Sequence, residues 1–479
     1  MKVQIRAVIF SIILLCNTAP IAAQSLTEVL EKLPNQEAFW SLTVRAEDGS
    51  ILESLNPNKL IVPASNQKLY TTAAVLDRLG GDFTYTTNVY SQGNLNDSTW
   101  TGDLIFRGSG DPTISGTLYN DDREFVFKSF LKQFREKGIG TIDGDLLAEV
   151  SYFDNEVYPK GWDWYDMSFY YAVQINPLSF NNNAFDLEVF AEGEVGGTPR
   201  IDWYPKIASI EITNNQTVVE PERKYDEFYR RRMGYNQFEL ASDLPQGYYE
   251  TEALSIDGAD FFFLETFENF LVRNNARTRL QNEFESEFEP NDYSSYKILA
   301  SHTSKPLSDL VRRINKDSDN FYTEMLIKTL AAEKQGIPGT FDNGITEVRS
   351  FLAEQKLDTN FVLMNDGSGL ADGNFTTTSN MSQLLTSMQK HKEYKAFYAS
   401  LPIAAIDGSL AYRFKNTPLA SNLRAKTGYV RGVRTISGYL VTKSGKKINF
   451  SLATNHFKGK VSVLDAAHQQ ILEYLYAKY

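Results

Sequence analysis

The sequence predicts an α/β (α+β) protein in which an antiparallel sheet is flanked by helices, with a large, mainly β insertion in the chain between its strands. Two observations lead to this prediction. Strand patterns lie at both ends of the chain, around residues 38–54 and again between 423 and 455, and a helical pattern follows each set. At 479 residues the chain is also too long for one ordinary core, so two or three domains are expected.

The N-terminal elements are predicted from turn and capping residues. Residues 38–54 contain two strand-like runs separated by Asp48-Gly49, a pair typical of a β-hairpin turn. A helix is then expected from about Ser65 to Gly80-Gly81, because an apolar helical pattern ends there at two glycines.

The middle of the chain has a different pattern from its ends. Strands and turns dominate from about 84 to 215, with a helical patch at 125–138, and another helix is expected at 261–275. Helical periodicity resumes after Pro306 and after Thr378, three strands follow, and a last helix is expected at 461–479. We therefore expect a main domain formed by residues 24–88 and 296–479, and inserted domains II and III within 89–295.

Residues 1–23 have the plan of a secretory signal peptide. Lys2 and Arg6 precede an apolar run that ends at Cys16, and small residues follow up to Ala23. We therefore expect an extracytoplasmic protein, in the periplasm, with at most a peripheral membrane contact. Cys16 is the only cysteine, so the mature chain would hold no disulfide, no cysteine-bound zinc and no cysteine nucleophile.

Charge and histidine content argue against two classes of function. The formal net charge of -12 disfavours binding to nucleic acid. The basic triplet Arg230-Arg231-Arg232 is surrounded by acidic residues, and we interpret it as a solvated cluster of local charge pairs. The four histidines lack the spacing of metal ligands, so neither a metal nor another cofactor is expected.

Ser65 and Lys68 form the first candidate catalytic pair. On a helix a lysine three residues after a serine lies on the same face, and a desolvated lysine can be neutral enough to take the hydroxyl proton. The Ser-x-x-Lys pattern also occurs at Ser129, Ser294, Ser387 and Ser444, so the pattern alone selects nothing. Ser65 is favoured because it starts a helix near the beginning of the mature chain, although it could also act only as a helix cap.

Ser318-Asp319-Asn320 is the second candidate element. Ser318 could pass a proton to a leaving amine and Asn320 could hold a substrate amide. A polar helix surface remains the alternative.

Lys426-Thr427-Gly428 is the third element, on a predicted strand. Such a strand can bind an extended peptide along its edge, and Lys426 offers a cation to a carboxylate. Gly428 allows close backbone approach. The backbone N–H groups of Tyr429 and Ser65 could form an oxyanion hole.

In this order the three elements resemble the motifs of serine β-lactamases and penicillin-binding proteins. The similarity extends to GDLIFRGSGDPT (102–113), GWDWYDMS (161–168), NDGSGL (365–370), IDGSL (406–410) and RAKTGYVRGV (424–433). The chain thus resembles the low-molecular-mass class C penicillin-binding proteins, peptidase family S13. The resemblance covers nearly all of the mature chain, including the long interval between Ser65 and Ser318.

The resemblance implies a β-lactamase/transpeptidase-like main domain. It also implies a serine-type D-Ala-D-Ala carboxypeptidase or endopeptidase that acts on peptidoglycan stem peptides and is inhibited by penicillin. Ser65 would be acylated with Lys68 as its base, and Ser318, Asn320 and Lys426 would complete the proton relay and substrate grip. Thr427 would contact the terminal carboxylate.

The resemblance also implies a subsite for the peptide side chain. Relatives specific for diaminopimelate read its distal end with an Asp and an aromatic residue, which correspond to Asp166 and Tyr171. Those relatives also use an Arg where this chain has Asp372, and a Gln where it has Arg431. Either the carboxylate-binding cation has moved to Arg431, or the preferred peptide differs.

Two alternatives stay open at this point. A serine β-lactamase shares the acylation chemistry, but the large insertion and the lack of a clear Glu-bearing loop argue against it. A non-catalytic peptidoglycan-binding envelope protein is disfavoured because all three motifs are intact.

Overall fold

The terminal sheet joins the two ends of the chain. The computed structural model describes residues 26–479 except 32, 36, 278–284 and 288–290, and the predicted signal peptide lies outside these residues. The five strands run in the order β19-β20-β21-β1-β2 and all neighbours are antiparallel. They are β1 (Phe39–Ala46), β2 (Ile51–Leu55), β19 (Leu423–Val430), β20 (Val433–Val441) and β21 (Lys447–Asn455). The predicted sheet assembled from both ends is therefore confirmed.

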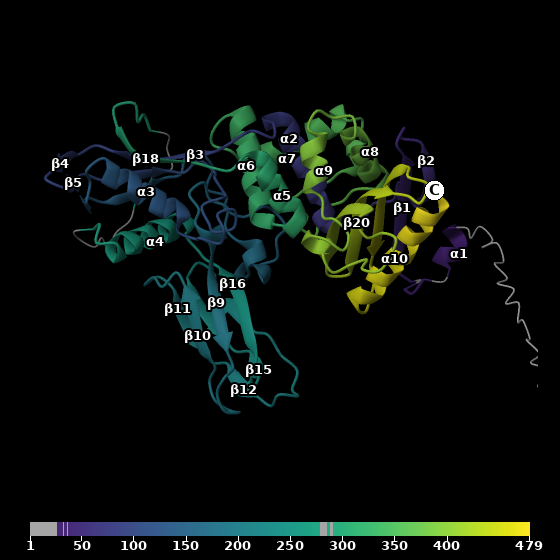
Figure 1. The fold of residues 1–479 in the computed structure, drawn as a ribbon, viewed down its shortest axis with the longest axis horizontal. Helices are drawn as coiled ribbons and strands as arrows, with labels where there is room; N and C mark the ends of the chain where they lie inside the picture. The colour runs from purple at the N-terminus through teal and green to yellow at the C-terminus, as the bar shows by residue number, and fades with distance from the viewer. Residues whose placement is uncertain (1–25, 32, 36, 278–284, 288–290) are drawn as a thin grey trace, which may run out of the picture.

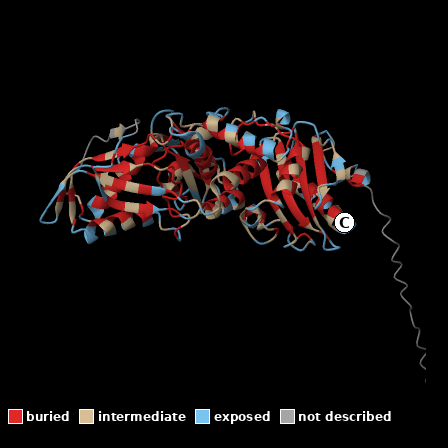
Figure 2. Cartoon of the chain, turned by 90° about the horizontal axis from the view of Figure 1, so that it is seen from above, coloured by how far each residue is buried: buried red, intermediate tan, exposed pale blue. Residues whose placement is uncertain are grey.

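Helices cover both faces of this sheet (Figure 1). On one face α10 (Val461–Lys478) and α1 (Leu26–Leu30) pack against apolar side chains of β1, β20 and β21. A helical cluster packs on the other face through α8 and Tyr439. It comprises α2 (Lys68–Leu79), α5 (Leu307–Asp317), α6 (Asn320–Gln335), α7 (Phe341–Glu354), α8 (Thr378–Met388) and α9 (Tyr394–Ser400). Figure 2 shows the sheet strands as largely buried between these layers.

A second five-stranded sheet lies beyond the helical cluster. Its strand order is β17-β8-β6-β3-β18. A separate small sheet, β4-β5-β7, is formed by segments that lie between its strands in the sequence. Its strands and those of the small sheet are β3 (Thr86–Ser91), β4 (Asn94–Asn96), β5 (Thr99–Thr101), β6 (Leu104–Arg107), β7 (Thr141–Asp143), β8 (Leu146–Glu149), β17 (Glu285–Glu287) and β18 (Lys297–Thr303). The helices α3 (Phe125–Glu136) and α4 (Ala259–Arg273) pack here around a cluster of phenylalanines.

A third region, the β lobe, comprises strands β9 to β16 and projects away from the rest of the molecule (Figure 1). Its strands are β9 (Ala184–Phe190), β10 (Arg200–Tyr204), β11 (Glu211–Asn214), β12 (Thr217–Val219), β13 (Tyr229–Arg231), β14 (Gln237–Leu240), β15 (Asp243–Pro245) and β16 (Tyr249–Ser255). Because β3 and β18 pair with each other at the two ends of the predicted insertion, we propose that the inserted part runs from Thr86 to Thr303.

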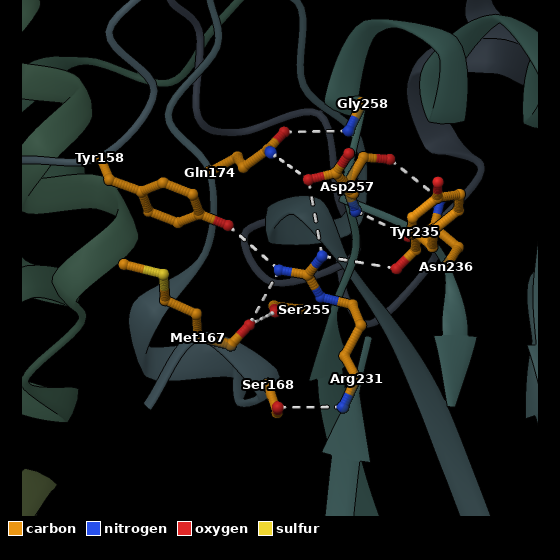
Figure 3. A network of polar contacts seen from close by, with 10 residues as sticks. All are labelled: Tyr158, Met167, Ser168, Gln174, Arg231, Tyr235, Asn236, Ser255, Asp257 and Gly258. Atoms are coloured by element: carbon orange, nitrogen blue, oxygen red, sulfur yellow. Dashed lines mark hydrogen bonds and ion pairs between the residues drawn. The ribbon is translucent and has the colours of Figure 1, made fainter. Parts of the chain in front are cut away.

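One expectation from the sequence is wrong. Arg231, predicted to be solvated, has a side chain that is only 1% exposed and lies within a polar network between the β lobe and the segment around Met167 (Figure 3). The physical reason is strand alternation: Arg230 and Arg232 are exposed, whereas Arg231 points to the opposite, covered side. The charge run therefore has two solvated members and one buried member.

Among the described residues no helix has both the length and the apolar character that crossing a membrane requires.

Candidate active site

Ser65 lies in a short 3₁₀ turn, η1 (Ala64–Gln67), directly before α2. The preceding residue, Ala64, has a φ of 47°, a conformation that costs free energy for a residue with a Cβ and that is often found at active sites. The turn packs against β19 and β20. The predicted helix start is thus a 3₁₀ turn that presents Ser65 at the edge of the terminal sheet.

Lys68 is fully buried at the first position of α2, and its ammonium has three acceptors. Nζ lies 3.1 Å from Ser65 Oγ, 2.6 Å from Asn320 Oδ1 and 2.8 Å from the carbonyl oxygen of Ser368. A neutral amine would keep two N–H groups on Asn320 and Ser368, and its lone pair would then face Ser65 Oγ. Burial lowers the pKa of Lys68 to about 8, against the opposing charges of Asp366 and Glu324. The geometry suits a base that receives the Ser65 proton.

Ser318 and Lys426 form a second hydroxyl–amine pair. Ser318 has a φ of 63° in the break between α5 and α6. Lys426 Nζ donates to Ser318 Oγ at 2.8 Å and to the carbonyl of Thr427 at 2.9 Å. Burial, followed by the charge of Lys68, holds the pKa of Lys426 well below its ordinary value. Two hydroxyls, each beside a lysine with a lowered pKa, therefore converge on one place.

The Asn320 side chain is engaged within the protein. Its Oδ1 accepts from Lys68, and its Nδ2 donates to the carbonyl of Tyr171 at 2.8 Å. The expected contact with a substrate amide is therefore not needed to explain the position of this side chain. Asn320 orients Lys68 and also joins α6 to the segment that carries Tyr171.

β19 is the edge strand of the terminal sheet, and Gly428 brings it close to Ser65. A Cβ at Gly428 would lie 2.3 Å from Thr435 Oγ1 and 3.0 Å from the backbone nitrogen of Ser65, so only glycine fits. Ile403 forms an isolated antiparallel β-bridge with Arg424 in the first half of β19. Within the described part of the chain, no β-bridge occupies the free edge of this strand after Arg424. The second half of β19 can therefore accept an extended peptide.

A cleft of about 760 Å³ opens at this place. Its lining includes seven of the residues predicted from the sequence: Ser65, Asp166, Tyr171, Ser318, Asn320, Tyr429 and Arg431. Lys68, Lys426 and Thr427 are buried, and Thr427 Oγ1 donates to Ser409 Oγ at 2.8 Å. The structure thus gathers the three motifs around one opening, whereas the serines of the other Ser-x-x-Lys matches do not line it.

The far wall of the cleft carries acidic and aromatic groups. Tyr171 Oη donates to Asp166 Oδ1 at 3.1 Å. Burial raises the pKa of Asp166, and the charges of Asp163 and Asp372 raise it further. Asp372 and Arg431 are both exposed and both line the opening. The cleft therefore presents carboxylates, together with the cations of Arg431 and Arg313, to whatever it holds.

Two buried carboxyl groups beneath Lys68 were not predicted from the sequence. Asp366 accepts from the backbone N–H groups of Gly369, Leu370 and Ala371 and from three side chains, those of Trp162, Ser368 and Asn374. Glu324 accepts from the backbone N–H groups of Gly367 and Ser368, and burial raises its pKa to about 8. Together they shape the turn that aims the Ser368 carbonyl at Lys68. The NDGSGL segment was the only available signal, and it names Asp366 but not Glu324.

Among the described residues no group of histidine, cysteine and acidic side chains is arranged to hold a metal ion. His302 and His468 are buried and contact hydroxyl groups of Tyr119 and Thr454, respectively.

The model of the D-Ala-D-Ala carboxypeptidase 3 (S13) family matches residues 22–475. A D-alanyl-D-alanine carboxypeptidase of an Actinomadura species is 29% identical over 449 residues, which is 90% of this chain and 81% of that protein.

The fold is similar to that of penicillin binding protein 4 from Haemophilus influenzae, with a TM-score of 0.82 and 24% identity over 95% of this chain and 99% of the other. A structure of that protein in complex with a β-lactam gives a TM-score of 0.77 and 23% identity over the same shares of the two chains.

Proposed function

Because the chain belongs to the D-Ala-D-Ala carboxypeptidase 3 (S13) family, we propose that Ser65 is the nucleophile with which it cleaves D-Ala-D-Ala peptides. The chain is a serine-type carboxypeptidase with the α/β fold of penicillin binding protein 4. The observation that carries the proposal is the 3.1 Å contact between Lys68 Nζ and Ser65 Oγ, with the two other lysine hydrogens already engaged.

The proposed acylation step starts with a proton transfer from Ser65 Oγ to neutral Lys68. Ser65 Oγ attacks the carbonyl carbon of the penultimate D-Ala, and the negative charge that develops on its oxygen lies at the backbone N–H groups of Ser65 and Tyr429. As the C–N bond to the terminal D-Ala breaks, Ser318 supplies a proton to the departing nitrogen, and Lys426, which donates to Ser318 Oγ, returns a proton to this hydroxyl. Thr427 and Gly428 lie on the strand along which the peptide extends.

Deacylation completes the cycle. A water molecule adds to the ester carbonyl of Ser65, a base removes its proton, and the Ser65 alkoxide leaves and is reprotonated. A β-lactam would acylate Ser65 through the same groups, because its strained amide is attacked in the same way. The β-lactam complex of the Haemophilus protein supports this part of the proposal.

Asp166, Tyr171 and Arg431 are proposed to contact the side chain of the third residue of the stem peptide. The support is that all three line the same cleft as Ser65. Where the diaminopimelate-specific relatives have an arginine, this chain has Asp372. Among the described residues that line the cleft, the cations are therefore Arg431 and Arg313 alone. We propose the periplasm as the place of action and peptidoglycan as the polymer that supplies the substrate.

Labelling with fluorescent penicillin tests the nucleophile. We expect wild type to be labelled and Ser65→Ala to remain unlabelled. Ser129→Ala, which alters the same sequence pattern on α3, should be labelled like wild type. Release of D-Ala from a D-Ala-D-Ala peptide should follow the same order. Equal labelling of Ser65→Ala would refute the assignment, and rapid, continuing hydrolysis of a chromogenic β-lactam would show a β-lactamase instead.

A further inference from the structure

Arg231 is a buried cation whose hydrogen bonds reach out of its own lobe (Figure 3). It ends β13, and its Nη2 donates to Tyr158 Oη at 3.1 Å and to the carbonyl of Met167 at 3.0 Å. Its backbone N–H donates to Ser168 Oγ at 3.0 Å. The planar guanidinium thus holds two partners that lie outside the β lobe.

The charge itself is weakly paired. Among the residues that the structure describes, Asp257 supplies the only carboxylate in contact, at 3.5 Å from Nη1 and with a side chain that is 32% exposed; Nη1 also donates to the carbonyl of Tyr235 at 3.5 Å. Gln174 donates to the same carboxylate oxygen at 2.7 Å. Because a buried cation is costly unless it is well partnered, a role limited to stabilising the fold explains this arginine poorly.

The segment that Arg231 contacts has little structure of its own. It consists of two short 3₁₀ turns, η2 (Asp166–Ser168) and η3 (Tyr170–Ala172), which are weak as isolated elements. Trp164, Tyr165 and Tyr170, in and beside these turns, are more than half exposed. Ser255 of β16 also donates to the Met167 carbonyl. The β lobe therefore supplies much of what fixes the position of this segment.

The other side of the same segment is the wall of the cleft. Asp166 directly precedes Met167, so one peptide bond separates a residue held by Arg231 from a residue that faces the opening. Tyr171 donates to Asp166, and its carbonyl accepts from Asn320. The segment is thus fixed by the β lobe behind it and by the catalytic helix α6 in front.

We propose that Arg231 is a positioning residue for substrate selection: it holds the η2 turn so that Asp166 and Tyr171 meet the side chain of the peptide. This inference rests on the proposed function, because it takes these two residues as contacts of the stem peptide. Loss of Arg231 should impair substrates that carry this side chain and spare those that do not. Penicillin belongs to the second group, since it needs only the groups around Ser65.

The test compares Arg231→Gln and Arg231→Lys with Arg230→Gln and Arg232→Gln, matched changes at the exposed neighbours. Penicillin titration first counts the competent active sites in each preparation. The value of kcat/KM is then measured for a stem pentapeptide that contains diaminopimelate and for N-acetyl-D-Ala-D-Ala, which lacks the side chain. Tyr158→Phe, which removes a single contact, is a milder variant in case the Arg231 substitutions fold poorly.

Per active site, we expect kcat/KM for the pentapeptide to fall on the order of 10- to 100-fold in both Arg231 variants, because small misplacements are costly. The value for N-acetyl-D-Ala-D-Ala should stay within about twofold, on the same reasoning. Equal losses on both substrates, or no loss on the pentapeptide, would overturn the proposal. If wild type takes up no penicillin, the proposed function fails; if the variants take it up and cleave both substrates normally, only the role of Arg231 fails.

Discussion

Raising the pH is expected to accelerate acylation of Ser65 until Lys68 is largely neutral. The reasoning depends on burial: Lys68 is fully enclosed, and desolvation lowers its pKa to about 8. Only the neutral amine has a lone pair that can take the Ser65 proton. This lone pair faces Ser65 because the two remaining hydrogens stay on Asn320 and on the carbonyl of Ser368. The active form therefore gains population as the pH rises.

The size of the effect follows from that pKa. With a pKa of about 8, about one molecule in a hundred has neutral Lys68 at pH 6 and about one in ten at pH 7. The second-order rate constant for acylation should rise about tenfold per pH unit below pH 7 and level off near pH 9. An unperturbed lysine would instead give a rate that still rises tenfold per unit at about pH 9.

Stopped-flow acylation by a reporter penicillin across this pH range measures the profile. Lys68→Arg should lower the rate on the order of 10²- to 10⁴-fold and remove the inflection, because arginine does not lose its proton. Lys132→Arg, in the matching pattern on α3, should leave the profile unchanged. A rate independent of pH between about 6 and 9 would refute the assignment of Lys68 as the base.

Three further predictions concern the groups around this pair. Asp366→Asn should lower the free energy of unfolding, measured by urea titration, by about 3 kcal/mol or more, because the new amide hydrogens would face N–H donors that now bind the carboxylate. Asp372→Asn, at an exposed site, is the control, and equal stability of the two variants would contradict this reasoning. Gly428→Ala should slow penicillin acylation at least about tenfold, since its Cβ would collide with Thr435 Oγ1, and an unchanged rate would show that the strand can move away. Arg431→Gln should raise KM about tenfold for a peptide whose side chain ends in a free carboxylate, and should change KM little for the same peptide with that carboxylate amidated. If the ratio of the two KM values is the same in the mutant and in wild type, Arg431 is not the carboxylate partner.

The architecture of the terminal sheet could be predicted from the sequence, and so could a place for Ser65 in the lining of the cleft. Strand alternation and glycine-terminated helices are local signals, so β1, β2, α2 and the final three strands could be predicted with small errors. The three motifs converge because the sheet brings β19 beside η1. Their order along the chain is the signal in the sequence that indicates one shared site.

The groups that surround the pair could not be found in the same way. Glu324 lies mid-helix with no motif, and its contact with Ser368 depends on how α6 packs against a distant turn. Arg231 was misinterpreted because a run of like charges suggests solvent, although the period of two in a strand places its middle member on the opposite face. Tertiary packing alone decided the position of Glu324, whereas for Arg231 the strand period gives the face and packing decides that this face is covered.

The assembly of the terminal sheet from both ends of the chain sets when this protein can become active. The Asn66 side chain, next to Ser65, donates to Ser437 Oγ at 2.7 Å across 371 residues of sequence. During synthesis Ser65 and Lys68 emerge early, whereas Lys426 and the strand that carries it are made long after them. A nascent or truncated chain that lacks β19 and β20 would therefore carry the proposed nucleophile without its cleft, and reaction with peptides or penicillin would have to wait for these late strands.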